Sequence, residues 1–298
     1  MSIEPPAVDG GARRAPGPEQ PLPMAVDNAT LVRLRDLCER YGDIVRIPQP
    51  GGRWAYFIND AQAVREILVR RHQGFRKGRG FERVKMLLGN GLIVSDGQHW
   101  RRSRTMIQPS FKPRQIHTLT DHMVRCARRL ERQWSDCMAN AAPLNITKET
   151  SDFALELILI SIFGEELADV PSLADDPRFA FLAPNAGRDL EMVKRVRELR
   201  QWISAVIAKR RTNDSQQDDF LGLYLHARDK DGQPFSEREL LDEMITLIVA
   251  GFETSANTLN WVWYLLADAP DVIHRILDEI ERETRGGLEL DAASAWRQ

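Results

Sequence analysis

The chain has 298 residues, of which 43% are hydrophobic and 28% charged, with a formal net charge of -2. This composition is ordinary for a globular protein of one large domain or two smaller ones. The near-neutral charge argues against nucleic acid or an anionic membrane as a partner. Cys38, Cys126 and Cys137 show no metal-ligand spacing, so we expect a reducing compartment without disulfides or a zinc site.

Residues 1–30 are predicted to form a flexible or extended lead, because six prolines lie between Pro5 and Pro23. This segment contains no apolar stretch of the kind found in signal peptides or membrane anchors. We therefore expect a cytoplasmic protein without a membrane anchor.

The patterns that follow predict a mostly α fold with a small N-terminal β-sheet. A helix over 31–40 precedes a β-hairpin made of 43–47 and 54–58, and Asn59-Asp60 caps a helix that runs to about 71. Further helices are expected at 82–88, 98–106, 115–139, 148–163, 178–182, 190–211 and 219–227. We find no internal repeat, and no linker after residue 30 that would split the chain.

The longest predicted helix begins at a capping box, with Ser236 at the N-cap and Glu239 three residues later. Since no proline follows until Pro270, a continuous helix would span ~45 Å. A last helix starts at Pro270 and runs to about 284, before the Gly286-Gly287 pair.

Between Glu243 and Asp268 the long helix carries one charged residue, Glu253. Its many hydroxyl and amide side chains disfavour a membrane span, so we expect a central core helix. Gly251, Glu253 and Thr254 are each unfavourable inside such a helix, which suggests a site. In one interpretation they form a kinked groove that holds a small ligand and delivers protons to it.

The other interpretation of the same segment is purely structural. Gly251 would allow a close helix crossing, Glu253 would pair with a distant arginine, and Thr254 would bond back to the carbonyl of Ala250.

A second signal lies at Trp100 and Arg104, whose spacing places them on one face of a helix. An indole N–H beside a guanidinium suits a buried carboxylate, while Arg102 points roughly opposite. The alternative is a solvated basic helix with its tryptophan in the core. The Gly78-Arg79-Gly80 and Gly89-Asn90-Gly91 segments do not fit phosphate-binding loops.

Taken in order, these segments resemble the cytochrome P450 family. The hairpin and helix over 44–68 are similar to the start of its small sheet. Trp100-x-x-x-Arg104, followed by Pro109-Ser110-Phe111, is similar to its haem-propionate motif, and Ala250-Gly251-Phe252-Glu253-Thr254 to its oxygen-activation motif. The resemblance implies a cytochrome P450 domain over 31–298, comprising the small sheet and helices B to J.

The resemblance also implies a haem cofactor and roles for individual residues. The residues implied to hold the haem carboxylates are Trp100, Arg104 and His99, and those implied to lie against the haem face are Ala250 and Gly251. Thr254 and Glu253 would serve in catalysis by handling the bound oxygen and its protons. Leu92 and Ile93 would line the substrate pocket.

The implied reaction is the insertion of one atom of dioxygen into a small apolar organic substrate. The electrons would come from a ferredoxin or a flavoprotein reductase.

The family also uses a cysteine thiolate in a Gly-rich loop and a Glu-x-x-Arg pair on a later helix. We expect both to lie outside these 298 residues, since no cysteine follows Cys137. The three cysteines fall in helical patterns before the long helix. We therefore expect a P450 fold incomplete at the C-terminus, haem binding only with a further segment, and an inactive chain as it stands. The alternatives are an inactive fragment or a helical protein that binds an apolar ligand without redox chemistry.

Overall fold

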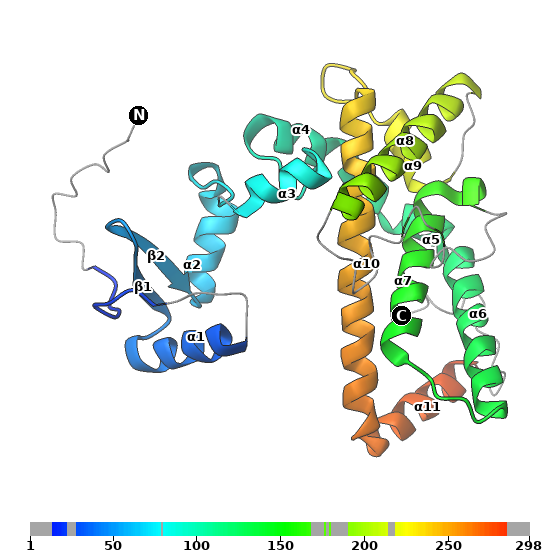
Figure 1. The fold of residues 1–298 in the computed structure, drawn as a ribbon, viewed down its shortest axis with the longest axis horizontal. Helices are drawn as coiled ribbons and strands as arrows, with labels where there is room; N and C mark the ends of the chain where they lie inside the picture. Colours follow the sequence, from blue (N-terminus) through cyan, green and yellow to red (C-terminus); the bar gives the residue numbers. More distant parts are fainter. Residues whose placement is uncertain are drawn as a thin grey trace. The chain divides into compact units, whose positions relative to one another are not determined.

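The computed structural model describes residues 14–22, 28–78, 80–167, 176, 179, 190–213 and 218–284 (Figure 1). The fold is mostly helical with a small sheet, as the sequence predicts. Contacts within the chain define two units, Met1–Arg76 and Lys77–Gln298. The helix expected at 178–182, the helix end at Gly286-Gly287 and much of the lead lie outside the described residues.

The first unit contains the predicted hairpin. Helix α1 (Asn28–Tyr41) precedes strands β1 (Ile44–Gln49) and β2 (Arg53–Ile58), which pair antiparallel with Ile44 opposite Ile58. Gly51 and Gly52 form the turn with φ of +78° and +71°, a region that favours glycine. Leu37, Val45 and Ile47 form the small core of this unit.

Helix α2 (Ala61–Arg65) continues into the π-helical turn η1 (Glu66–Arg70) and the short 3₁₀ turn η2 (His72–Gly74). The predicted cap is confirmed, because the Asp60 carboxylate accepts a hydrogen bond from the Ala63 amide at 2.7 Å.

The second unit is helical throughout its described part. Its elements are α3 (Gly80–Leu88), α4 (Gly97–Ile107), η3 (Gln108–Phe111), α5 (Pro113–Thr118), α6 (Thr120–Ala139), α7 (Ile146–Phe163), η4 (Gly164–Leu167), α8 (Leu190–Asn213), α9 (Phe220–His226), α10 (Glu237–Ala267) and α11 (Pro270–Thr284). The single helix expected over 115–139 is wrong, because the chain breaks between α5 and α6 at Leu119. That side chain is 3% exposed within the core, so tertiary packing decides the break.

Helix α10 has 31 residues, and the predicted capping box is confirmed. The Ser236 hydroxyl accepts from the Glu239 amide at 3.3 Å, and the Glu239 carboxylate accepts from the Ser236 amide at 2.8 Å. Figure 1 shows α7 running alongside α10 and α11 crossing near its far end. Within the described ranges, no helix is long and apolar enough to cross a membrane.

The expectation that all of α10 is a core helix is correct for its first half and wrong for its second. Buried positions run from Leu240 to Ala256, whereas Trp261 and Tyr264 are each 64% exposed. Among the described residues this second half meets α7 through a Thr150–Asn260 hydrogen bond of 2.9 Å, and α6 through a Trp134–Trp263 ring contact. These contacts cover one side of the helix, which leaves the other side exposed.

A buried ion cluster joins the end of α7 to α8 and α9. The Arg210 side chain is 1% exposed and donates to both Asp219 oxygens, at 2.7 and 2.8 Å, and to Glu166. It also donates to the Phe163 carbonyl at 2.7 Å, while Asp219 caps α9 by accepting from the Gly222 amide. Because each charge is paired and hydrogen-bonded, the cluster is tolerated inside the core.

We expect Arg210→Met to lower the free energy of unfolding by about 3–5 kcal/mol, because Asp219 and Glu166 would lose their buried partner. Lys209→Met is the control: this neighbouring side chain is exposed, so its change should be within about 0.5 kcal/mol. Urea denaturation followed by circular dichroism measures both. Equal stability of the two variants would contradict a supporting role for the cluster.

Candidate functional site

Helix α4 presents Trp100 and Arg104 on one face, as their spacing predicts. Trp100 is half-buried and Arg104 is exposed, and no acidic side chain of the described residues forms an ion pair with Arg104. This guanidinium is therefore available to an anionic group.

Arg102 points away from that face and anchors α4 to the start of α10. Its guanidinium donates to Asp229 Oδ2 and Glu239 Oε1, both at 2.7 Å, and to the Pro234 carbonyl at 2.9 Å. The hydrogen bond from Arg102 lowers the pKa of the Asp229 carboxyl. Arg102 thus anchors α4 to the start of α10.

His99 lies at the junction of α4, α10 and the loop before α4. Its Nε2 is 3.1 Å from the Asn90 carbonyl, and its Nδ1 is 3.8 Å from Glu239 Oε1. These contacts tie the half-buried ring to protein groups. Its role toward a haem carboxylate stays a prediction.

On α10, Thr254 Oγ1 donates to the Ala250 carbonyl at 2.7 Å, and Thr258 makes the same bond to Thr254 at 2.9 Å. Ala250 and Gly251 are half-buried, whereas Glu253 and Thr254 are exposed. No cation in the described part of the chain pairs with Glu253, so the distant arginine of the structural interpretation is not observed there.

Gly251 marks a close crossing of α10 and α7. A Cβ atom added there would lie 2.6 Å from Ile158 Cδ1, which is closer than side chains approach one another. This part of the structural interpretation holds. An apolar cavity of about 540 Å³ lies beside it, bordered by Gly251 and Thr254 from α10 and by Phe153 and Leu157 from α7.

The loop of Leu92 and Ile93 is held directly against α10. Leu92 packs on the main core, and Ile93 is 38% exposed. The Leu92 amide donates to Glu243 Oε2 at 3.0 Å, and Lys77 Nζ donates to the Leu92 carbonyl at 3.0 Å. The loop conformation is therefore fixed from both sides of its backbone.

The sequence analysis did not single out Asp242 and Glu243. Their carboxylates accept hydrogen bonds from the Asn90 and Leu92 amides, and we call this attachment of the loop to α10 the clamp. Asp242 accepts from Arg200 Nη2 at 2.7 Å and from the Asn90 amide at 2.9 Å. Glu243 is 3% exposed, its Oε1 has no hydrogen-bond partner among the described residues, and burial raises the pKa of its carboxyl. The signal that could have found them is a pair of acids followed by a long apolar run.

The Gly89-Asn90-Gly91 segment has its explanation in this clamp. Gly89 has φ of +88°, and a Cβ there would lie 2.0 Å from Asp242 Oδ1. A Cβ at Gly91 would lie 2.1 Å from Thr246 Oγ1 and 2.6 Å from the Asp242 carbonyl oxygen. The two glycines let the loop backbone lie directly on α10.

A family model described as cytochrome P450 matches residues 22–291. The chain belongs to the cytochrome P450 family. It is 27% identical to pentalenene oxygenase of Streptomyces avermitilis over 81% of this chain and 56% of the relative. It is 29% identical to cyclooctat-9-en-7-ol 5-monooxygenase of Streptomyces melanosporofaciens over 83% of this chain and 56% of the relative.

This P450 chain therefore spans 56% of the length of those two Streptomyces relatives. The crystal structure of the cytochrome P450DA heme domain matches with a TM-score of 0.78 at 19% identity, over 95% of this chain and 67% of that one. The structural match confirms the fold expected from the sequence.

The residues present fit part of a haem site. Arg104, which has no acidic partner among the described residues, lies beside Trp100 and suits the haem carboxylates. Of the cysteines, Cys126 is 2% exposed, and burial raises the pKa of its thiol to about 12. A protonated thiol is not a thiolate ligand, so Cys126 does not suit the iron.

We expect Gly91→Ala to detach the loop from α10, because the new Cβ would collide with the Asp242 backbone. Hydrogen exchange measured by mass spectrometry should show faster exchange of the Asn90 and Leu92 amides. The unfolding free energy should fall by about 1–3 kcal/mol. Gly78→Ala is the control, since a Cβ there meets nothing within 4 Å. Unchanged protection of both amides in Gly91→Ala would rule out the clamp.

The clamp should also depend on pH. Because the folded state raises the pKa of Glu243 above its usual 4.5, the folded protein holds an extra proton, and unfolding free energy falls as pH rises through that pKa. Glu243→Gln removes this slope, while Glu237→Gln at an exposed position keeps it. Urea denaturation between about pH 4.5 and 8 measures the slopes, and parallel wild-type and Glu243→Gln curves would refute the assignment.

Proposed function

We propose that this P450 chain, together with a further segment that supplies the thiolate ligand, holds haem and an apolar organic substrate for a monooxygenase reaction, in which one atom of dioxygen enters the substrate. Family membership and the names of the two Streptomyces relatives support this proposal. The observation that carries it is the Thr254 hydroxyl on α10, which donates to the Ala250 carbonyl beside the exposed Glu253 carboxylate.

Haem, when bound, supplies the activation of dioxygen. Trp100 and Arg104 would hold its carboxylates, with His99 beside them on the same helix. Arg102 keeps α4 in place through its bonds to Asp229 and Glu239, so the donors are pre-positioned.

Thr254 and Glu253 handle protons. The Thr254 hydroxyl proton is engaged by the Ala250 carbonyl, so its lone pairs are free to accept from a water or a bound ligand. Glu253 is the neighbouring acid and is exposed, so it exchanges protons with solvent. The pair can pass a proton from solvent to a group bound at Thr254.

The loop of Leu92 and Ile93 is attached to α10 on the face that also carries Thr254. Glu243, which holds the Leu92 amide, precedes Thr254 by 11 residues, or about three helical turns. In a regular helix the two positions therefore point in nearly the same direction, ~16 Å apart along the axis. Leu92 and Ile93 line the substrate pocket on that side.

Electrons for the reaction come from a ferredoxin or a flavoprotein reductase, and we place the protein in the cytoplasm. One relative, the bifunctional cytochrome P450/NADPH–P450 reductase 1 of Bacillus subtilis, is 23% identical over 95% of this chain and 28% of its own length. Its name joins the two activities in one polypeptide.

A second candidate function is the binding of an apolar ligand without redox chemistry, in the cavity bordered by Gly251 and Thr254. Haemin titration of the chain separates the two functions. Saturable quenching of tryptophan fluorescence that weakens in Arg104→Ala, with Arg128→Ala on α6 as control, supports haem. Equal titrations of wild type and Arg104→Ala favour the apolar-ligand function.

In haem-loaded protein that includes the further segment supplying the thiolate, we expect Thr254→Ala to divert dioxygen into hydrogen peroxide and lower product formation by about 10²-fold or more. Thr258→Ala is the matched control, because it removes the same back-bond one turn later. Product, hydrogen peroxide and oxygen consumption are measured together with isotopically labelled dioxygen. Equal product yields from both variants would count against the assignment of Thr254.

A further inference from the structure

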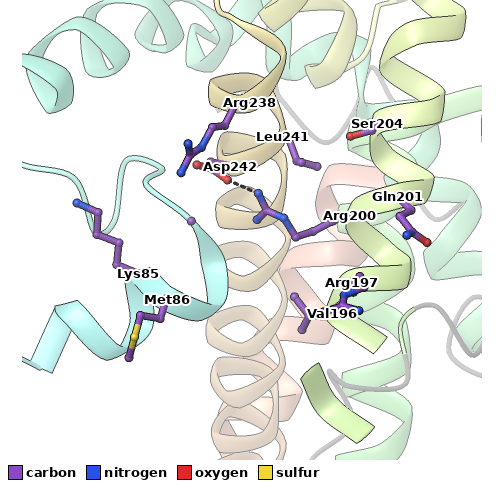
Figure 2. Close-up of a pocket in the computed structure, with 11 residues that line it drawn as sticks. Lys85, Met86, Val196, Arg197, Arg200, Gln201, Ser204, Arg238, Leu241 and Asp242 are labelled. Carbon is purple, nitrogen blue, oxygen red and sulfur yellow. Dashed lines mark hydrogen bonds and ion pairs between the residues drawn. The ribbon is translucent and has the colours of Figure 1, made fainter. Parts of the chain in front are cut away.

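A second cavity lies between α3, α8 and α10, on a different part of α10 from Thr254 (Figure 2). Its volume is about 890 Å³, and it is an open groove. Figure 2 shows Lys85 and Met86 on one side and the α8 residues on the other, with Arg238 and Asp242 from α10 between them.

Positive charge dominates this groove. Its lining contains four cations, Lys85, Arg197, Arg200 and Arg238, against a single carboxylate, Asp242. That carboxylate is already used, since it accepts from Arg200 at 2.7 Å and from the Asn90 amide at 2.9 Å.

The other three cations are exposed, and none pairs with an acidic side chain in the described ranges. Like charges gathered around one hollow create a positive potential that favours an anion. The Arg200–Asp242 ion pair forms a polar part of the groove lining.

The floor of the groove is formed in part by two buried apolar residues, beside the polar Gln201 and Ser204. Val196 is 5% exposed and Leu241 is 8% exposed, and both belong to the main hydrophobic core. The Met86 side chain, 82% exposed, adds a flexible apolar surface at the rim. A bare inorganic anion would leave the apolar floor uncovered, whereas a neutral apolar molecule would leave the cations without a partner.

We propose that this groove binds an apolar small molecule that carries a carboxylate. The exposed guanidinium groups of Arg197 and Arg238 attract the carboxylate, for which a planar guanidinium offers paired donors. The apolar part of the ligand lies against Val196 and Leu241. The volume is within the range of small-molecule sites. This inference goes beyond the proposed function, because the binding needs neither haem nor dioxygen.

Isothermal titration calorimetry of the 298-residue chain with octanoate, below its micelle-forming concentration and at low salt, tests the proposal. The comparison ligands are 1-octanol, which has the same chain without the charge, and inorganic phosphate. The double variant Arg197→Ala/Arg238→Ala removes the two guanidinium groups. Arg128→Ala/Arg132→Ala on α6 is the charge-matched control, because both of its arginines are exposed and unpaired among the described residues.

We expect one saturable octanoate site, weakened about tenfold or more in the groove variant and unchanged in the α6 variant. 1-Octanol and phosphate should each bind at least about tenfold more weakly than octanoate. Circular dichroism melts check that the variants remain folded.

Several results would overturn the proposal. They are the absence of a saturable octanoate site, equal affinity for 1-octanol or for phosphate, and unchanged octanoate affinity in the folded groove variant. Because none of these results involves haem, failure here is distinguishable from failure of the proposed monooxygenase function.

Discussion

Two adjacent buried carboxylates, Asp242 and Glu243, hold separate parts of the second unit against the first half of α10. Neighbouring residues on a helix point about 100° apart, so the two side chains reach different partners. Asp242 binds α8 through Arg200 and the loop through the Asn90 amide, while Glu243 binds the loop again at the Leu92 amide. Burying them is costly, and these hydrogen bonds offset the cost.

This clamp links the two halves of the proposed chemistry. The loop of Leu92 and the turn of Thr254 are far apart in sequence. The loop is hydrogen-bonded to α10, and Thr254 belongs to the same helix, which begins at the Ser236 capping box. Arg102 fixes α4, with Trp100 and Arg104, to the same end of α10. The groups that we propose hold the cofactor and the substrate and handle protons are thus positioned by one element, which reduces the reorganisation needed on binding.

Features set by neighbours in the chain could be predicted from the sequence. The hairpin turn at Gly51 and Gly52, the caps at Asp60 and Ser236, and the Thr254–Ala250 bond each depend on residues a few positions apart. Features set by distant partners could not. The sequence does not show that Arg102 meets Asp229, that Leu119 is buried at a helix break, or that the far side of α10 is open at Trp261.

The buried thiol of Cys126 also has a use as a reporter. Alkylating reagents attack thiolates, and this thiol is both 2% exposed and raised in pKa to about 12, so it is inert while α6 is packed. Cys38 and Cys137 are partly exposed. The labelling rate of Cys126 therefore reports how often the helical core opens, and the labelling of Cys38 and Cys137 provides the comparison.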